Sequence, residues 1–341
     1  MFIEDKYMKY RVILVSCEDV DDRSSRLWSG TTFYCSEAIK KQFEVIGAKI
    51  GYPWVKERGD MEKRYLGGKA DFSLLLASYD PEGKHRPFAI YVDDASQPPE
   101  SYKRVIYTRK TFDHALVIFA FSDFERKMII DDYGITPSKV VTVGAGPNLR
   151  RLPSINNKEF DGKTILFVGS DMSRKGGLVL LEAFKKVKEM ISNARLIIIS
   201  SDAYIYSKER ELRHFGIIIK NFVSKQTLGH WYRCASVFVM PSFYEPFGIV
   251  FLEAMAYKLP CIGTNVCAMP EIIDDAKTGF VVRPGDANEL AEKIIYLLRH
   301  KMVSKHMGEL GRKKVEQYYL WDRVAQRMEK HVESVLKKRK Y

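Results

Sequence analysis

The sequence has few cysteines, no histidines at ligand spacing and no long apolar run. Its five cysteines are an odd number in 341 residues and none forms a CxxC pair, so we expect reduced thiols in a cytoplasmic protein. His85, His114, His214 and His230 lack the spacing of zinc ligands, so no zinc site is expected, and no cofactor is predicted. No apolar run approaches the roughly 20 residues that span a bilayer, and the acidic N-terminus is unlike a secretion signal.

Positive charge is concentrated at the C-terminal end. Residues 301–341 carry twelve Lys and Arg side chains against five Asp and Glu, which places +7 of the total net charge of +12 there. Aromatic side chains do not interleave with these basic residues and no helix-turn-helix pattern accompanies them, so nucleic acid is not an expected partner. Two interpretations stay open: a helix face in water, or peripheral contact with an anionic membrane surface.

Short β-branched runs alternate with amphipathic stretches, which predicts parallel sheets built from βαβ units. In the first half, helices are expected at residues 32–46 and Asp123–Tyr133, with Gly134 ending the second helix. The expected strands of this half are residues 10–16, 70–76, Phe88–Val92, 115–120 and 140–143.

Residues 144–163 are rich in Gly, Pro, Asn and charge and have no periodicity, so they are predicted to link two domains. The alternation then restarts. Strands are expected at Thr164–Val168, Arg195–Ile199, 237–240 and 259–262, and helices at 178–190, 248–256, Ala287–Arg299 and onward to the C-terminus. Two such halves predict an α/β protein of two Rossmann-like, doubly wound domains that face each other across a cleft, with ligands at the carboxyl ends of the strands.

Residues 241–256 are the most informative stretch. A strand ends there, a loop with Glu245 and Gly248 follows, and an apolar helix begins. Gly248 lets the backbone come close to a ligand, and the helix start offers unpaired N–H donors and a positive dipole end, which suits a diphosphate. Glu253 lies about 7.5 Å further along the helix, beside the expected ribose. Glu245 can reach sugar hydroxyls on the other side of the phosphates.

The string Glu-Pro-Phe-Gly-Ile-Val-Phe-Leu-Glu-Ala-Met-Ala at 245–256, with its two glutamates separated by seven residues, resembles the signature of the retaining glycosyltransferases of group 1, which have the GT-B fold. The resemblance continues through residues 259–264, 269–273 and 278–282. Upstream, residues 167–177 resemble the phosphate-binding strand and loop of that family. Residues 122–149 resemble the end of its first domain, and Trp-Ser-Gly-Thr at 28–31 more weakly resembles its first-strand loop.

The resemblance implies an acceptor domain over residues 1–150, a donor domain over 160–319, and a last helix at about 320–341 that packs back on the first domain. Glu245 and Lys175 would be the catalytic residues. The nucleotide sugar would contact Gly169, Ser170, Arg174, Lys175, Phe247, Gly248, Ile249, Val250 and Glu253. The acceptor and sugar side would hold Gly30, Thr31 and either Asp93 or Asp94. For residues 28–31 a second interpretation stays open, in which this stretch is an ordinary helix start capped by Ser29.

The sequence departs from the family pattern at several positions. Ser170 stands where the family usually has an Arg that shares the diphosphate charge, and Arg174 lies next to Lys175 instead. Neighbouring side chains of an extended loop point apart, so Arg174 is not expected to replace that Arg. An Asp (93 or 94) matches the family's His near the transferred sugar, and residues 267–268 are Cys-Ala where the family has paired glycines. The run at 19–21 resembles the metal-binding carboxylates of another glycosyltransferase class, but in this fold it is expected to be a polar loop.

The expected function is transfer of a sugar from a UDP-, GDP- or ADP-sugar to a glycan, lipid-linked or small-molecule acceptor. The resemblance implies retention of configuration, by front-face attack, without a metal. Two alternatives stay open. One is a sugar phosphorylase or synthase of the same fold, and the other is a catalytically silent nucleotide-sugar-binding subunit, which Ser170 makes conceivable.

Overall fold

The computed structural model describes residues 10–16, 31–50, 63–65, 71–76, 87–92, 102–156, 158–221 and 223–339. The chain forms two compact units. The first comprises Met1–Asn148 together with Tyr319–Tyr341, and the second comprises Leu149–Tyr318. Among the described residues, no helix is long and apolar enough to cross a membrane.

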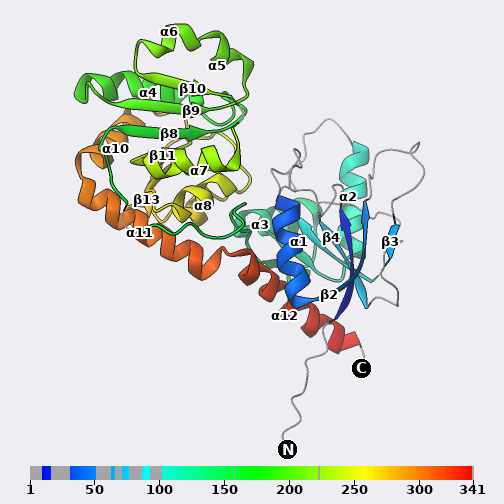
Figure 1. Cartoon of the computed structure of the whole chain (residues 1–341). Helices are drawn as coiled ribbons and strands as arrows, with labels where there is room; N and C mark the ends of the chain where they lie inside the picture. The colour runs from blue at the N-terminus through cyan, green and yellow to red at the C-terminus, as the bar shows by residue number, and fades with distance from the viewer. Residues whose placement is uncertain are drawn as a thin grey trace, which may run out of the picture. The chain divides into compact units, whose positions relative to one another are not determined.

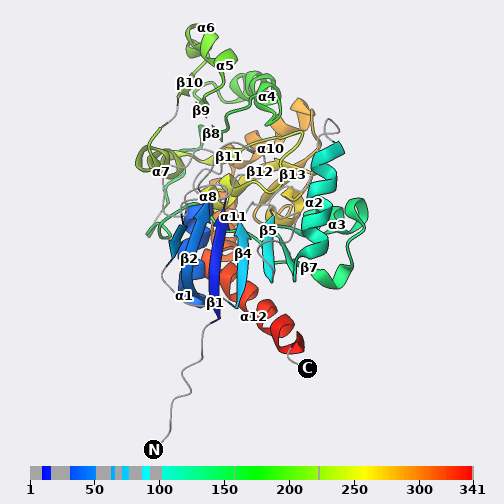
Figure 2. The same cartoon turned by 90° about the vertical axis from the view of Figure 1, so that its right-hand side faces the viewer.

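A seven-stranded sheet forms the centre of the first unit, in the order β3-β2-β1-β4-β5-β6-β7. Its strands are β1 (Arg11–Ser16), β2 (Glu44–Ile50), β3 (Lys63–Tyr65), β4 (Phe72–Leu76), β5 (Phe88–Val92), β6 (Ile118–Ala120) and β7 (Val140–Thr142). The short edge strand β3 is antiparallel to β2, and the other neighbouring strands are parallel. The strands after β1 extend the sheet first on one side and then, from β4 onward, on the other, so the sheet is doubly wound (Figure 2).

The helices of this unit come from both ends of the chain. They are α1 (Thr31–Gln42), α2 (Tyr102–His114), α3 (Asp123–Tyr133), the 3-10 turn Pro137–Lys139 and α12 (Trp321–Arg339). The last helix, drawn in red, lies along α1 (Figure 1). An ion pair of 2.7 Å between Lys41 Nζ and Asp322 Oδ1 joins these two helices. The last helix is therefore part of the first unit.

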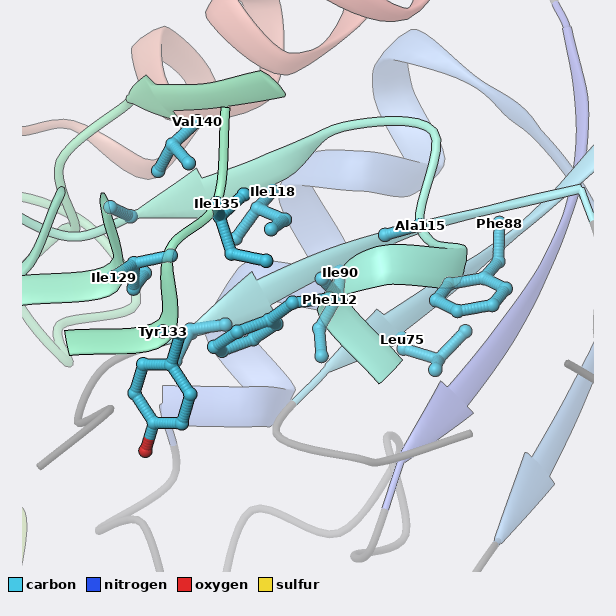
Figure 3. Close-up of a cluster of buried hydrophobic side chains, with 12 residues drawn as sticks. Leu75, Phe88, Ile90, Phe112, Ala115, Ile118, Ile129, Tyr133, Ile135 and Val140 are labelled. Carbon is cyan, nitrogen blue, oxygen red and sulfur yellow. The ribbon is translucent and has the colours of Figure 1, made fainter. Parts of the chain in front are cut away.

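Apolar side chains from α2, α3 and the neighbouring strands form a buried core in the first unit (Figure 3). The rings of Phe112 and Tyr133 meet edge to face with centroids 5.3 Å apart. Ser122 caps α3 by accepting a hydrogen bond from the Glu125 amide, and Gly134 ends this helix with a φ of 66°. These cap residues explain why α3 begins and ends where the sequence predicts.

The second unit contains a six-stranded, wholly parallel sheet in the order β10-β9-β8-β11-β12-β13. Its strands are β8 (Thr164–Val168), β9 (Arg195–Ile199), β10 (Ile217–Lys220), β11 (Val237–Val239), β12 (Cys261–Thr264) and β13 (Gly279–Val282). Chain order reverses direction between β8 and β11. In a doubly wound sheet this switch point is where the loops at the carboxyl ends diverge and leave room for a ligand.

Eight helices are described in the second unit. They are α4 (Gly177–Met190), α5 (Ala203–Ser207), α6 (Glu209–Arg213), α7 (Lys225–Cys234), α8 (Ile249–Ala256), α9 (Met269–Ile272), α10 (Ala287–Arg299) and α11 (Lys301–Tyr318). Figure 1 shows α4 and α10 lying beside the sheet formed by β8 and its neighbours. Asp286 caps α10 by accepting hydrogen bonds from the amides of Asn288 and Glu289.

One predicted helix is wrong at its end, and several elements were not predicted. The helix expected over residues 32–46 stops at Gln42, and β2 begins at Glu44. Val45 is β-branched and pairs with Val12 in the parallel sheet, so sheet pairing outweighs the helical periodicity of this stretch. The elements that the sequence pattern did not indicate are β2, β3, α2, the 3-10 turn, α5, α6, β10, α7, α9 and β13.

Candidate active site

Two loops meet at the switch point of the second sheet. One follows β8 and carries Lys175, and the other follows β11 and carries Glu245. Lys175 Nζ lies 3.1 Å from Glu245 Oε2, and the two side chains are only 13% and 12% exposed. A backbone hydrogen bond of 2.8 Å from the Phe243 amide to the Arg174 carbonyl also joins the loops. The sheet topology thus brings the two predicted catalytic residues into contact.

Arg174 points toward the same carboxylate as Lys175. Its Nη1 atom lies 3.5 Å from Glu245 Oε2 and donates to the Tyr244 carbonyl at 2.8 Å. Its Nε atom lies 3.4 Å from Asp171 Oδ2. The expectation that the Arg174 and Lys175 side chains point apart is wrong, because this segment is not extended.

Turns in the loop after β8 account for this arrangement. The Lys175 amide donates to the Asp171 carbonyl at 3.0 Å, and the Gly176 amide donates to the Ser173 carbonyl at 3.2 Å. The alternation of side chains in an extended chain therefore does not apply here. Two adjacent cations come to face one acidic side chain.

Two glycines allow the loops to pack this closely. A Cβ on Gly176, whose φ is 68°, would lie 1.9 Å from the Pro241 carbonyl oxygen. A Cβ on Gly169 would lie 2.5 Å from Cδ of Lys175, so the lysine stem runs over this glycine. Gly169 thus contributes by making room for Lys175.

The start of α8 lies beside Glu245. Gly248 is the N-cap of this helix with a φ of 89°, and a Cβ there would lie 3.4 Å from Glu245 Cγ and 2.6 Å from Met269 Cε. Phe247 and Gly248 are buried, whereas Ile249 and Val250 of the first turn are half-buried. The first amides of a helix have no intrahelical acceptor and point out of its positive end. This end of α8, Lys175 and Arg174 form a local concentration of positive charge around Glu245.

Glu253 is buried one turn further along α8, with only 3% of its surface exposed. Its Oε2 atom accepts a hydrogen bond of 3.1 Å from the Tyr232 hydroxyl, and Lys225 Nζ lies 3.7 Å from its Oε1 atom. Burial, followed by the nearby Glu253 carboxylate, raises the pKa of the Tyr232 phenol. Tyr232 therefore stays a neutral donor that orients this carboxylate.

Lys225 and Tyr232 contact Glu253 and are further candidate site residues that the sequence pattern did not indicate. Both lie on α7, which Ser224 caps by accepting a hydrogen bond from the Thr227 amide. The cap followed by Leu228, Trp231 and Tyr232 at helical spacing was the available signal. Lys225 is 51% exposed, so it can move away from Glu253 when another partner arrives.

The remaining predicted site residues are distributed as follows. Ser170 is exposed in the loop after β8. Thr31 lies in the first unit, where it is buried and its Oγ1 atom accepts a hydrogen bond of 3.0 Å from Asn148 Nδ2. Gly30, Asp93 and Asp94 lie outside the described residues, as does the acidic run at 19–21. Within the described part of the chain, no cluster of His, Cys, Asp and Glu side chains could hold a metal ion.

The geometry of the second unit suits an anionic ligand with polar hydroxyl groups. A helix start and two cationic side chains can neutralise phosphate oxygens. Carboxylates on either side, Glu245 before α8 and Glu253 within it, can accept hydrogen bonds from hydroxyl groups. The sequence model of the family described as "Glycosyl transferases group 1" matches residues 150–314, which is nearly the whole of this unit. The chain carries a glycosyl transferases group 1 domain.

Relatives of this group 1 domain include an uncharacterized glycosyltransferase of Methanocaldococcus jannaschii. The two sequences are 34% identical over 183 residues, which cover 52% of this chain and 46% of the relative. The chain spans about half or less of the length of several curated relatives that it matches.

Solved structures of the GT-B class resemble the chain over most of its length. Sucrose-phosphate synthase from Thermosynechococcus elongatus matches 97% of this chain and 100% of its own at a TM-score of 0.72, with 18% identity. HepE of Anabaena, solved in complex with UDP and glucose, matches 76% of this chain and 77% of its own at a TM-score of 0.61, with 15% identity. At these identities the likeness shows the fold, which is two Rossmann-like parallel-sheet domains.

Proposed function

We propose that this chain is a retaining glycosyltransferase that moves a sugar from a nucleotide-diphosphate sugar to an acceptor without a metal ion. The convergence of Lys175, Arg174 and Glu245 beside the first turn of α8 carries the proposal. A diphosphate at this point replaces Glu245 as the partner of Lys175. The developing negative charge of the leaving group is then stabilised by cations and amides that are already in place.

The donor lies along the start of α8 in this proposal. Its diphosphate meets the Gly248–Val250 amides and Lys175, while Glu245 accepts hydrogen bonds from the sugar. Glu253 accepts a hydrogen bond from the ribose through Oε1, where Lys225 is now 3.7 Å away and exposed enough to move. Tyr232 keeps Oε2 occupied, so the other oxygen faces the ligand. UDP-, GDP- and ADP-sugars are the donor candidates, and the UDP complex of HepE supports the first.

The sugar is transferred with retention in this scheme because the acceptor hydroxyl attacks on the face that the diphosphate leaves. The C1–O bond to the diphosphate breaks, a bond forms to the acceptor oxygen, and the departing phosphate takes the acceptor proton. No side chain of the second unit is needed as a nucleophile. The acceptor, a glycan, a lipid-linked sugar or a small molecule, binds the first unit near Gly30, Thr31 and Asp93 or Asp94.

A donor panel tests this function. The full chain is incubated with UDP-, GDP- and ADP-sugars, with and without a mixture of simple sugar acceptors and EDTA, and the released nucleoside diphosphate is measured. One nucleotide sugar is expected to turn over in EDTA, and the Glu245→Gln variant should lose this turnover. The control is Arg213→Gln, which removes an exposed charge on α6. Turnover only with added manganese would contradict the metal-independent mechanism, and a product of inverted configuration would contradict retention.

A second candidate, a catalytically silent nucleotide-sugar-binding subunit, is favoured by one observation. The position usually held by a phosphate-binding Arg is an exposed Ser170, and Arg174 is engaged with Glu245 and the Tyr244 carbonyl. This candidate predicts saturable donor binding with no release of nucleoside diphosphate under any acceptor condition. Turnover in the donor panel excludes it.

A further inference from the structure

A cavity of about 690 Å³ lies in the second unit, away from the candidate active site. Its lining includes Asp161, just before β8, Arg195 at the start of β9, and Cys234 at the end of the helix that leads to β11. All three positions mark the amino ends of parallel strands. The loops of the candidate active site follow the carboxyl ends of the strands of the same sheet, so the cavity lies at the opposite, amino ends of these strands.

Lys158 is the buried cation of this cavity. Its Nζ atom donates to the carbonyls of Tyr232 and Arg233 at 2.9 and 2.7 Å, at the C-terminal end of α7. An ammonium group has three N–H donors. The third has no hydrogen-bond partner in the described part of the chain, although the residue is only 8% exposed, and Nζ lies 5.5 Å from the centre of the Phe160 ring. Burial lowers the pKa of Lys158 to about 8.

Arg195 supplies further donors. Its Nη2 atom binds Asp161 Oδ2 at 3.1 Å and Thr164 Oγ1 at 2.9 Å. Its Nε and Nη1 atoms have no partner among the described residues, and the side chain is about half exposed. The two remaining donors, Nε–H and Nη1–H, lie on different edges of the guanidinium, so each can donate a single hydrogen bond to an anion.

Asp161 is the ion-pair partner of Arg195 and offsets one of these positive charges. Its two oxygens already accept hydrogen bonds from the amides of Lys163 and Thr164, from the hydroxyls of Thr164 and Ser236, and from Arg195. Burial acts to raise the pKa of this carboxyl, but those hydrogen bonds outweigh burial and lower the pKa to about 2. Asp161 is therefore an ionised structural group that holds Arg195 in place.

Arg233 is the third cation of the lining. Its guanidinium lies 5.2 Å from the centre of the Tyr257 ring, and no carboxylate pairs with it in the described part of the chain. Glu159, an exposed residue, is the other acid of the lining. Among the described lining residues, three cations therefore face two carboxylates, and the lining keeps a small excess of positive charge.

We propose that this cavity binds a small anion through Lys158, Arg195 and Arg233, with a phosphate or carboxylate group as the recognised chemistry. An oxyanion can accept single hydrogen bonds from Arg195 and from the third N–H of Lys158. Its negative charge offsets the cost of burying the Lys158 ammonium. The site is separate from the donor site and does not depend on the proposed transfer reaction.

The test measures the melting temperature of the full chain against sodium phosphate and, separately, sodium citrate, with sodium chloride holding the ionic strength constant. A ligand that binds only the folded state raises the melting temperature, by about 2–4 °C for a roughly tenfold excess over the dissociation constant. Arg195→Gln and Arg233→Gln should each weaken the apparent affinity about 10-fold or more. Arg213→Gln is the matched control, because it also removes an arginine that is paired with one acidic residue.

Further arms separate the cavity from the donor site. Lys175→Met should keep the response to phosphate, since Lys175 follows the carboxyl end of β8 and the cavity lies at the amino ends of the strands. Raising the pH from 7 to 9 should weaken binding, because Lys158 loses its charge near pH 8. A response to phosphate alone or to citrate alone identifies the preferred oxyanion and supports the site. Three results would overturn the proposal: no saturable response to either anion, an unchanged response in Arg195→Gln, or a response that only Lys175→Met abolishes.

Discussion

Lys175 Nζ lies 3.1 Å from Oε2 of Glu245, and this ion pair joins the loop after β8 to the loop after β11. The pair keeps two functional groups neutralised and nearly buried before any ligand arrives. A donor diphosphate must compete with Glu245 for Lys175, so binding exchanges one anionic partner for another. Glu245 is then released toward the sugar.

The Lys175→Met variant tests the role of this cation. We expect kcat/KM for the nucleotide sugar to fall about 10–100-fold, because a charge-assisted hydrogen bond to the leaving group is worth about 1.5–3 kcal/mol. The control is Lys185→Met, which removes an exposed lysine on α4. Steady-state kinetics that fail to distinguish the two variants would exclude Lys175 from the donor site.

Glu253 and Glu245 should differ in what they bind. We expect Glu253→Ala to weaken the binding of plain nucleoside diphosphate by about 1.5–3 kcal/mol and Glu245→Ala to affect it less, because only Glu253 is placed for ribose. Calorimetric titration measures both affinities. Equal nucleoside diphosphate affinity in Glu253→Ala and the unmodified chain would remove the ribose assignment.

The Tyr232→Phe variant tests whether nucleotide binding depends on the hydrogen bond that orients Glu253. The variant keeps the carboxylate but removes the hydrogen bond of 3.1 Å that orients it. We expect a smaller loss of nucleotide affinity than in Glu253→Ala, since the ribose partner is still present. A full loss of affinity in Tyr232→Phe at unchanged stability would mean that orientation of Glu253 matters as much as its charge.

Ser170→Arg and Arg174→Ala test how the loop after β8 neutralises phosphate. If the site lacks one cation, Ser170→Arg should tighten donor binding by about 1–2 kcal/mol. Arg174 already faces Glu245, so its removal should be severe if it has taken over the missing role. Donor affinity in the two variants decides between these outcomes, and no effect from either would mean that this loop does not touch the diphosphate.

Gly176→Ala should destabilise the second unit. An added Cβ would meet the Pro241 carbonyl at 1.9 Å, and the residue would also hold a positive φ of 68°. The matched control is Gly285→Ala, which has a φ of 80° but no contact closer than 3.5 Å. The control should lose about 1–2 kcal/mol of unfolding free energy from backbone strain alone, and Gly176→Ala clearly more. Denaturant unfolding measures both, and equal losses would show that the loops can separate without cost.

Lys158 should make stability depend on pH. Its pKa falls from 10.5 to about 8 on folding, so between these values the unfolded chain holds a proton that the folded chain has lost. Stability therefore rises with pH across this window, by about 3 kcal/mol for this group. Lys158→Met should show a flatter rise from pH 8 to 10.5 than the unmodified chain, while the surface control Lys208→Met should follow it. Parallel curves for the two variants would contradict the assignment.

Much of the fold could be predicted from local pattern. The β-branched runs at Thr164–Val168 and Arg195–Ile199, and the capped helix Asp123–Tyr133, specify their own structure. The α/β class and the group 1 family followed from these runs and from the string around Glu245. In contrast, the sequence of α2 is largely polar, and β2 becomes a strand through its pairing with β1. Such elements depend on tertiary partners that a single sequence does not display.

The site was less predictable than the fold. The string at 245–256 indicates which carboxylates matter but not what holds them. Tyr232 and Lys225 reach Glu253 from a helix that precedes it by about twenty residues, and only the folded sheet brings them together. The orientation of Arg174 likewise depends on turns formed by backbone hydrogen bonds within residues 171–176, which side-chain identity alone did not reveal.

The helix α12 belongs to the first unit although the second unit separates it in sequence. Its Trp321 donates to the Pro147 carbonyl at 3.0 Å, and Arg327 Nε donates to the Val143 carbonyl at 2.8 Å. Within the second unit, Arg312 of α11 donates to the Pro153 carbonyl at 3.0 Å, so the beginning and end of that unit lie together. The second unit is therefore one continuous stretch of chain, residues 149–318, whose first and last segments lie next to each other. Recombination at two positions, one near each end of the second unit, could therefore exchange that unit as a whole. Truncation after Tyr318 would instead remove α12, which is part of the first unit.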